Sequence, residues 1–264
     1  MTTTIAPAQP FMGLGSSGSA ATVLRSVNLS GPAGRLEALL NEGTADAPFA
    51  ALVCHPHPLG GGTFHNKVVY HAMKVLNDPE WGLGWPVLRF NFRGVGLSEG
   101  VHDGEAESED VLAAIEWLEN EYKLPLVVVG FSFGAAMAVK ACCGRGSTGK
   151  LPGLKSETWG TQLNARCGEN STSANVGALA LLGLPTQANG RNFQYASLQD
   201  CTIPKLFLSG DCDSFAPDTQ LAQVAATAAE PKRLVLIPRA DHFFTGQLEP
   251  MQHALSTWLK EQLL

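Results

Sequence analysis

A serine between two glycines is the residue of this sequence best placed to act as a nucleophile. Residues 130–134 read Gly-Phe-Ser-Phe-Gly, between an apolar run at 126–129 and an alanine- and methionine-rich run at 135–141. A tight turn from a strand into a helix requires glycine on both sides of the serine, and it exposes the hydroxyl at the carboxyl edge of a sheet. We therefore predict that Ser132 is a catalytic nucleophile, the alternative being an ordinary turn bounded by glycines.

Such a serine needs a base to remove its proton, and the base needs a carboxylate to orient it. His242 follows a late apolar run, on a loop at the same edge of the predicted sheet, whereas His253 lies within a helical pattern and is expected to be a surface or packing residue. Asp211 and Asp213 both follow the apolar run before them. We assign the carboxylate to Asp213, further out on its loop, and keep Asp211, which is more typical of a turn-capping residue, as the alternative.

Short apolar runs rich in Val, Leu and Phe must position these residues. Near-continuous runs of this kind are typical of parallel strands covered on both faces, and apolar residues at helical spacing lie between them, from Val111 and from Met251. The alternation predicts an α/β fold with a doubly wound, mostly parallel sheet, and an antiparallel pair at 22–29 and 35–40 that leads into it. The expected parallel strands are 49–54, 86–92, 124–131, 178–184, 205–209 and 233–237.

We expect a single domain over residues 21–264 after a mobile leader at 1–20. The 264 residues, 45% of them hydrophobic, are enough for a large buried core. Residues 144–176 are polar, and they are long for a connection within a compact domain. They are either a partial lid or rim over an apolar cleft or a mobile surface insertion.

The charge pattern excludes the common surfaces for nucleic acid and for anionic membranes, because the net charge is −6 and Lys and Arg are not clustered. No stretch is long and apolar enough for a membrane span, and the first 20 residues lack the pattern of a secretory signal. The six cysteines show no zinc-type spacing. We therefore expect a cytoplasmic protein with reduced cysteines, of which Cys54 and Cys212 resemble buried free thiols. The sequence does not indicate an oligomeric state.

Five carboxylates are closely spaced around the start of the predicted helix at 111. They could form a cation site, or they could be solvated residues at a helix start, where carboxylates suit the helix dipole. We favour the second interpretation because no calcium-loop pattern is present. The five residues are Asp103, Glu105, Glu107, Glu109 and Asp110.

Two further motifs are weak indications of a bound metal ion or a bound dinucleotide. His55 and His57 have the spacing of a metal pair, but no third ligand follows at a useful spacing. Residues 94–96 read Gly-Val-Gly after a strand, as in a dinucleotide loop, but Glu99 occupies the position of the third glycine. We expect no metal and no organic cofactor, and we expect Arg93 to pin neighbouring loops by hydrogen bonds rather than to contact substrate.

The sequence resembles the α/β-hydrolase-fold serine hydrolases, and it is most similar to small, nearly lidless bacterial members. The resemblance rests on the serine motif at 130–134, on the loop 55–62, which reads His-Pro-His-Pro-Leu-Gly-Gly-Gly, and on the strand-and-turn segment 89–100. It covers roughly residues 20–264.

The resemblance implies an oxyanion hole formed by the backbone N–H of Phe133 and by one N–H of the first loop. His57 is the expected second donor; Pro58 has no N–H, which leaves Leu59 as the fallback. Leu59, Phe215 and Phe243 are expected to contact substrate. The phenylalanines beside the motifs could line an apolar acyl pocket or pack beneath the loops; they are Phe64, Phe131, Phe133, Phe215, Phe243 and Phe244.

The expected activity is hydrolysis of small to medium acyl esters through an acyl-enzyme on Ser132, with a small-molecule ester as the substrate. A serine peptidase or an acyltransferase of the same fold would share the acyl-enzyme chemistry. An aminopeptidase would need carboxylates near the cleft, which the acids after Glu99 could supply. A non-catalytic binding protein of this fold is a further alternative, and the complete triad argues against it.

Overall fold

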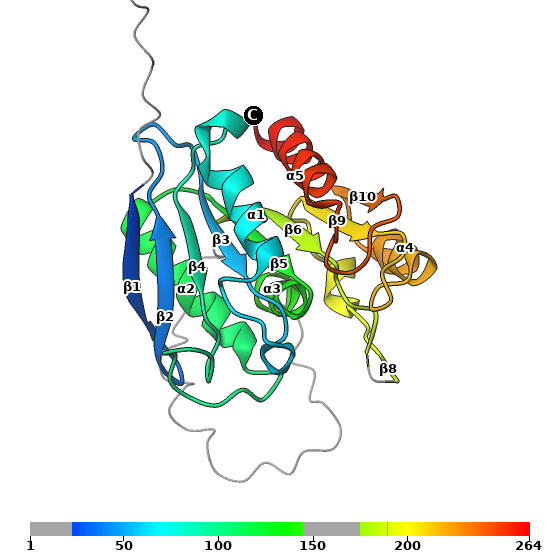
Figure 1. Ribbon diagram of the computed structural model, residues 1–264, viewed down its shortest axis with the longest axis horizontal. Coiled ribbons are helices and arrows are strands. Elements are labelled where there is room, and N and C mark those ends of the chain that lie inside the picture. The colour runs from blue at the N-terminus through cyan, green and yellow to red at the C-terminus, as the bar shows by residue number, and fades with distance from the viewer. Residues whose placement is uncertain (1–22, 145–174, 189) are drawn as a thin grey trace, which may run out of the picture.

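An eight-stranded sheet forms the centre of the computed structural model, which describes residues 23–144, 175–188 and 190–264. The strand order is β1-β2-β4-β3-β5-β6-β9-β10, in which β2 runs antiparallel to both neighbours and the other pairs are parallel. The predicted fold class is therefore confirmed (Figure 1). The strands are β1 (Leu24–Gly31), β2 (Gly34–Asn41), β3 (Ala50–Cys54), β4 (Val87–Phe90), β5 (Leu126–Phe131), β6 (Val176–Leu182), β9 (Lys205–Gly210) and β10 (Lys232–Ile237).

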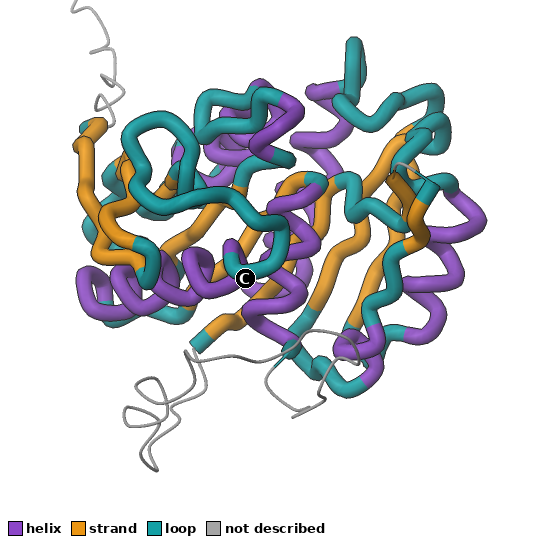
Figure 2. Tube along the Cα trace, turned by 90° about the horizontal axis from the view of Figure 1, so that it is seen from below, coloured by secondary structure: helices purple, strands orange, loops and turns teal. Residues whose placement is uncertain are grey.

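Helices cover both faces of this sheet, as Figures 1 and 2 show. Because side chains alternate along a strand, Ala51 and Val53 of β3 pack on the side of α1 and α5, whereas Leu52 and Cys54 pack on the side of α2, α3 and α4. Both faces of the central strands are apolar, which explains their near-continuous hydrophobic runs. The helices are α1 (Lys67–Asn77), α2 (Glu107–Tyr122), α3 (Phe133–Cys143), α4 (Asp218–Thr227) and α5 (Leu248–Leu263).

Two helices and a small hairpin were not predicted individually. Helix α1 carries a clear start signal, because the Asn66 side chain accepts a hydrogen bond from the Val68 N–H at 2.9 Å. Helix α4 is shorter, at 10 residues, and has no side-chain cap. The hairpin of β7 (Gln187–Ala188) and β8 (Arg191–Asn192) follows β6 and contacts the loop after β9.

The polar segment 144–176 can be compared with the structure only at its ends. Val176, assigned to the insertion from the sequence, is the first residue of β6, and its side chain packs against the core. The two interpretations of the insertion concern residues that lie otherwise outside the described ranges, and so does the expected leader at 1–20. Within the described ranges, no helix has the length and apolar character needed to cross a bilayer.

The expectation of six reduced cysteines is wrong for one pair. Cys143, at the end of α3, forms a disulfide with Cys201, and their Cα atoms are 5.3 Å apart. The partners are 58 residues apart in the sequence and meet only in the folded chain, so spacing could not reveal the bond. Cys54 is a buried free thiol as expected, but Cys212 is exposed because it lies on a loop beyond the end of β9. The cysteine argument for a cytoplasmic location therefore no longer holds.

Candidate active site

Ser132 lies at a sharp turn between β5 and α3. Its backbone has φ 55° and ψ −120°, a conformation that a residue with a side chain rarely adopts. A Cβ atom on Gly130 would lie 2.5 Å from the Ala135 Cα, and one on Gly134 would lie 2.5 Å from the Cys54 carbonyl oxygen. Both flanking glycines are therefore required by close backbone contacts, as the sequence motif predicts.

Two loops at the same edge of the sheet bring a histidine and an aspartate to this turn. The loops follow β9 and β10 and are in direct contact, since a Cβ on Gly210 would lie 2.0 Å from the Ala240 carbonyl oxygen. Gly183, after β6, leaves room for the imidazole, because a Cβ there would lie 3.1 Å from the His242 Cε1. The carboxyl ends of parallel strands lie at the same edge of a sheet, which explains how residues from three distant segments of the chain meet.

The structure brings Ser132, His242 and Asp213 into one hydrogen-bonded chain. The His242 Nδ1 lies 2.8 Å from the Asp213 Oδ2, and the His242 Nε2 lies 2.8 Å from the Ser132 Oγ. A carboxylate only accepts, so Nδ1 donates to Asp213, and the unprotonated Nε2 accepts from the serine hydroxyl. This arrangement can remove the serine proton as the oxygen attacks a carbonyl carbon.

Four donors surround the buried Asp213 carboxylate. Besides His242, the Ser209 Oγ donates to Oδ2 at 2.8 Å, and the backbone N–H groups of Phe215 and Ala216 donate to Oδ1 at 2.8 and 3.0 Å. Burial acts to raise the pKa of Asp213. The hydrogen bond and the electrostatic attraction between Asp213 and His242 outweigh burial, together with the hydrogen bonds from Ser209 and Phe215, so the pKa of Asp213 lies below its ordinary value. Ser209 was not predicted, and no local pattern distinguishes it from another residue at a strand end.

Asp211 has a different role from Asp213. Its Oδ1 accepts a hydrogen bond of 2.7 Å from the backbone N–H of Arg239, on the loop that carries His242. It is exposed, and the hydrogen bond of the imidazole goes to Asp213 instead. Asp211 therefore joins the two loops, which agrees with the turn-capping role considered from the sequence.

The backbone N–H groups of Phe133 and His57, the two expected oxyanion donors, make no hydrogen bond within the described part of the chain. Phe133 is the first residue of α3, so its N–H has no acceptor within the helix. Among the described residues, the N–H of His57 donates to no other group, while that of Leu59 donates to the His57 Nδ1 at 3.2 Å. The N–H groups of Gly60 and Gly62 both donate to the His57 carbonyl oxygen, which holds the loop in a tight turn. Leu59 is thus the poorer second donor.

The three residues predicted to bind substrate lie on the surface near these loops. Leu59 is 84% exposed, Phe243 52% and Phe215 38%, and the last two pack their rings against His242 with centroids 5.2 and 4.6 Å away. They can form an apolar rim beside the imidazole. The other phenylalanines that flank the motifs are buried in the core: Phe64, Phe131, Phe133 and Phe244.

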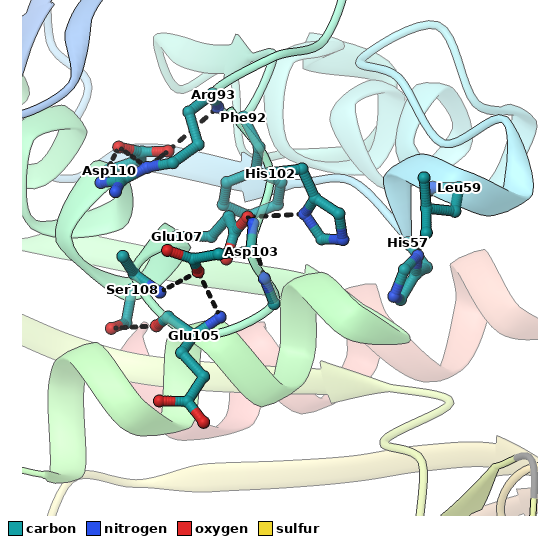
Figure 3. Close-up of polar contacts among 12 residues, drawn as sticks. His57, Leu59, Phe92, Arg93, His102, Asp103, Glu105, Glu107, Ser108 and Asp110 are labelled. Carbon is teal, nitrogen blue, oxygen red and sulfur yellow. Dashed lines mark hydrogen bonds and ion pairs between the residues drawn. The ribbon is translucent and has the colours of Figure 1, made fainter. Parts of the chain in front are cut away.

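The interpretation of the acidic stretch as solvated is wrong for two of its five residues. Glu107 and Asp110 are fully buried, on the inner face of the first turn of α2. Asp110 accepts from the backbone N–H and the guanidinium of Arg93, with a shortest distance of 2.7 Å from Nη2 (Figure 3). Arg93 therefore pins the loop after β4, as expected. Across the described part of the chain, no three His, Cys, Asp or Glu side chains are grouped to hold a metal ion.

His55 is a structural residue of the first loop. Its Nδ1 lies 2.6 Å from the Pro56 carbonyl oxygen, and its Nε2 accepts from the Phe92 N–H at 3.1 Å. Both ring nitrogens are therefore used within the protein. Burial lowers the pKa of His55 to about 4, so the ring is neutral at pH 7.

Comparisons with known proteins agree with this geometry at the level of fold. The sequence matches the alpha/beta hydrolase domain over residues 72–258. It is 30% identical to an uncharacterised protein of Rickettsia prowazekii over 88% of this chain and 87% of that protein. It is similar to a crystal structure from Xanthomonas campestris, described as a serine hydrolase without a lid (27% identity, TM-score 0.71, covering 90% of this chain and 94% of that one). A serine hydrolase homologue from Coxiella burnetii is 29% identical, with a TM-score of 0.70, and covers 89% of this chain and 97% of its own.

Proposed function

The chain belongs to the alpha/beta hydrolase family, and from that premise we propose that it is a serine carboxylic-ester hydrolase for small to medium acyl esters. One observation carries the proposal: the Ser132 Oγ, the His242 imidazole and the Asp213 carboxylate are linked by two contacts of 2.8 Å. These three residues are the proposed nucleophile, general base and orienting carboxylate. The proposed oxyanion donors are the backbone N–H groups of Phe133 and His57.

In the acylation step, the Ser132 oxygen forms a bond to the ester carbonyl carbon while its proton passes to the His242 Nε2. The carbonyl oxygen becomes an oxyanion that the two N–H groups stabilise, and Asp213 stabilises the imidazolium. The carbon–oxygen bond to the alcohol then breaks, and His242 returns its proton to the leaving oxygen. The product of this step is an ester between the acyl group and Ser132.

Water completes the cycle by the same route. His242 removes a proton from the water as its oxygen attacks the acyl carbon, and the bond to Ser132 breaks with return of the proton to the serine oxygen. All proton transfers thus pass through one imidazole whose tautomer is fixed by Asp213.

The surroundings of the serine support an ester with a modest apolar acyl group. The exposed side chains of Leu59, Phe215 and Phe243 can contact such a group without enclosing it. Of the carboxylates that an aminopeptidase could use, Glu107 and Asp110 are buried and paired within the protein, which leaves the exposed Asp103, Glu105 and Glu109 for that alternative. An acyltransferase would use the same first step with another acceptor in place of water.

The nucleophile is tested by Ser132→Ala, with Ser26→Ala on the exposed edge strand β1 as the matched control. We expect Ser132→Ala to lower kcat for p-nitrophenyl acetate by roughly 10⁴-fold or more and to abolish labelling by a fluorophosphonate, while the control matches the parent. A substrate series from acetate to octanoate tests the acyl preference. Equal turnover or equal labelling by Ser132→Ala would overturn the proposed function.

A further inference from the structure

A second imidazole–carboxylate pair lies outside the proposed triad, at the start of α2. The His102 Nδ1 is 2.5 Å from the Glu107 Oε1, which also accepts from the N–H groups of Asp103 and Gly104 at 3.0 and 3.3 Å. The Glu107 side chain is fully buried, and its Oε2 has no hydrogen-bond partner. Burying a carboxylate is costly, so a fully buried one beside a reactive centre calls for a physical explanation.

His102 packs against both residues whose N–H groups are proposed to bind the oxyanion. Its ring centroid lies 4.9 Å from that of His57 and 5.6 Å from that of Phe133, and the His57 and Phe133 rings are 5.0 Å apart. Figure 3 shows His102 with Glu107 on one side and His57 on the other. The three rings therefore form one cluster that joins the loop before α2, the start of α3 and the first loop.

The bond to Glu107 restricts the His102 ring. An acceptor-only carboxylate that is held by two backbone N–H groups fixes both the Nδ1–H tautomer and the ring orientation. A fixed ring in contact with His57 and Phe133 limits how far these two residues can move relative to each other. An oxyanion hole depends on such preorganisation, since its donors must lie within hydrogen-bond distance before the charge develops.

We propose that His102, anchored by the buried Glu107, is a positioning residue that holds the peptide groups of His57 and Phe133 at the spacing needed to bind the oxyanion. The inference rests on the proposed function. It assigns to His102 no contact with the substrate and no proton transfer. It predicts an effect on the transition state rather than on ground-state binding.

The test measures kcat and KM for p-nitrophenyl acetate, with kcat expressed per active site that a fluorophosphonate labels at completion. For His102→Ala we expect kcat per labelled site to fall roughly 10- to 100-fold, part of the loss for a complete oxyanion donor, with KM within about twofold of the parent. A purely structural role would lower the number of labelled sites and the melting temperature but leave kcat per site unchanged.

Three further variants separate the ring contacts from the anchor. His102→Phe keeps the ring and loses the bond to Glu107, His102→Asn keeps a donor near the Nδ1 position and loses the ring, and Glu107→Gln keeps an acceptor without the charge. We expect each to lose less kcat than His102→Ala. The control is His253→Phe, which should match the parent in kcat and KM. Among the described residues, His253 makes the only other ion pair between a histidine and a glutamate, an exposed contact of 3.8 Å with Glu249 on α5.

Three outcomes would overturn the inference: unchanged kcat per site in His102→Ala, a rise in KM without a fall in kcat, or full activity of His102→Phe. The failure of the proposed function is a separate result. It would appear as a parent protein that is not labelled at Ser132, whereas failure of this inference leaves the parent labelled and active.

Discussion

The two aspartates of the loop after β9 have different roles, although they are only two residues apart. Asp213 is buried and bonded to the His242 imidazole, whereas the exposed Asp211 accepts from the backbone of the loop that carries the histidine. Only the first can select the tautomer that leaves Nε2 unprotonated toward Ser132. The same substitution at the two positions should therefore have very different effects on activity.

We predict that Asp213→Asn lowers kcat for p-nitrophenyl acetate by about 10⁴-fold, because an amide can donate to Nδ1 and hold the wrong tautomer. Asp211→Asn keeps the oxygen that accepts from the Arg239 N–H, so its kcat should stay within about threefold of the parent. Steady-state kinetics of the two purified variants checks the prediction. If kcat fell more in Asp211→Asn than in Asp213→Asn, the assignment of the orienting carboxylate to Asp213 would be wrong.

Some residues of this site could be predicted from the sequence and others could not. Ser132 is flanked by glycines that its local backbone requires, so a five-residue motif was enough to select it. His242 and Asp213 were selected because each follows a strand of a parallel sheet. The roles of Glu107 and Ser209 depend on partners that are distant in the sequence or buried on folding, and no spacing indicates them.

Among the elements, helix α3 connects the nucleophile to the first active-site loop. Its second residue, Gly134, lies directly against the end of β3 and the start of that loop, where an added Cβ would meet the carbonyl oxygens of Cys54 and His55 at 2.5 and 2.6 Å. Backbone atoms cannot rotate away as a flexible side chain can. The helix and the loop are therefore held at a distance that only glycine allows.

We predict that Gly134→Ala forces α3 away from the first loop, lowering the free energy of unfolding by about 2 kcal/mol or more and kcat by at least roughly tenfold. Gly60→Ala, in the first active-site loop, is the matched control, because a Cβ there meets no atom within 4 Å. It should leave both quantities close to those of the parent. Urea denaturation and esterase kinetics provide the two measurements, and a fully active, stable Gly134→Ala would contradict the packing argument.

The strands were predicted closely both in the buried centre of the sheet and at its partly exposed edge, where β10 begins one residue before the predicted start. The central strands β3, β5 and β9 are fully buried and appear in the sequence as apolar runs, and their observed ends lie within two residues of those predicted. Helix α1 was not predicted, although the Asn66 side chain caps its start. The bond between Cys143 and Cys201 joins segments 58 residues apart, which only the folded topology brings together.

On the scale of the whole molecule, buried titratable groups make folding depend on pH. His55 is buried and neutral in the folded chain, and its pKa is lowered to about 4, whereas in the unfolded chain it would be protonated below about pH 6.5. The unfolded state therefore binds more protons between these values, and stability falls as the pH decreases through that window. Asp213 adds a further loss of stability at lower pH. Because its pKa in the folded protein is below the ordinary value, it stabilises the fold at neutral pH, and this stabilisation disappears as the pH falls through that pKa.

We predict that the free energy of unfolding decreases by about 3 kcal/mol between pH 7 and pH 4 because of His55, since a pKa difference of one unit corresponds to about 1.4 kcal/mol. His55→Gln keeps an acceptor for the Phe92 N–H but cannot be protonated, so it should be less stable at pH 7 and show a smaller decrease toward pH 4. His253→Gln, at an exposed position, should keep the parent's pH dependence. Urea denaturation at half-unit steps of pH measures all three proteins, and a parent whose stability is flat from pH 6.5 to pH 4 would show that His55 is not held neutral by the fold.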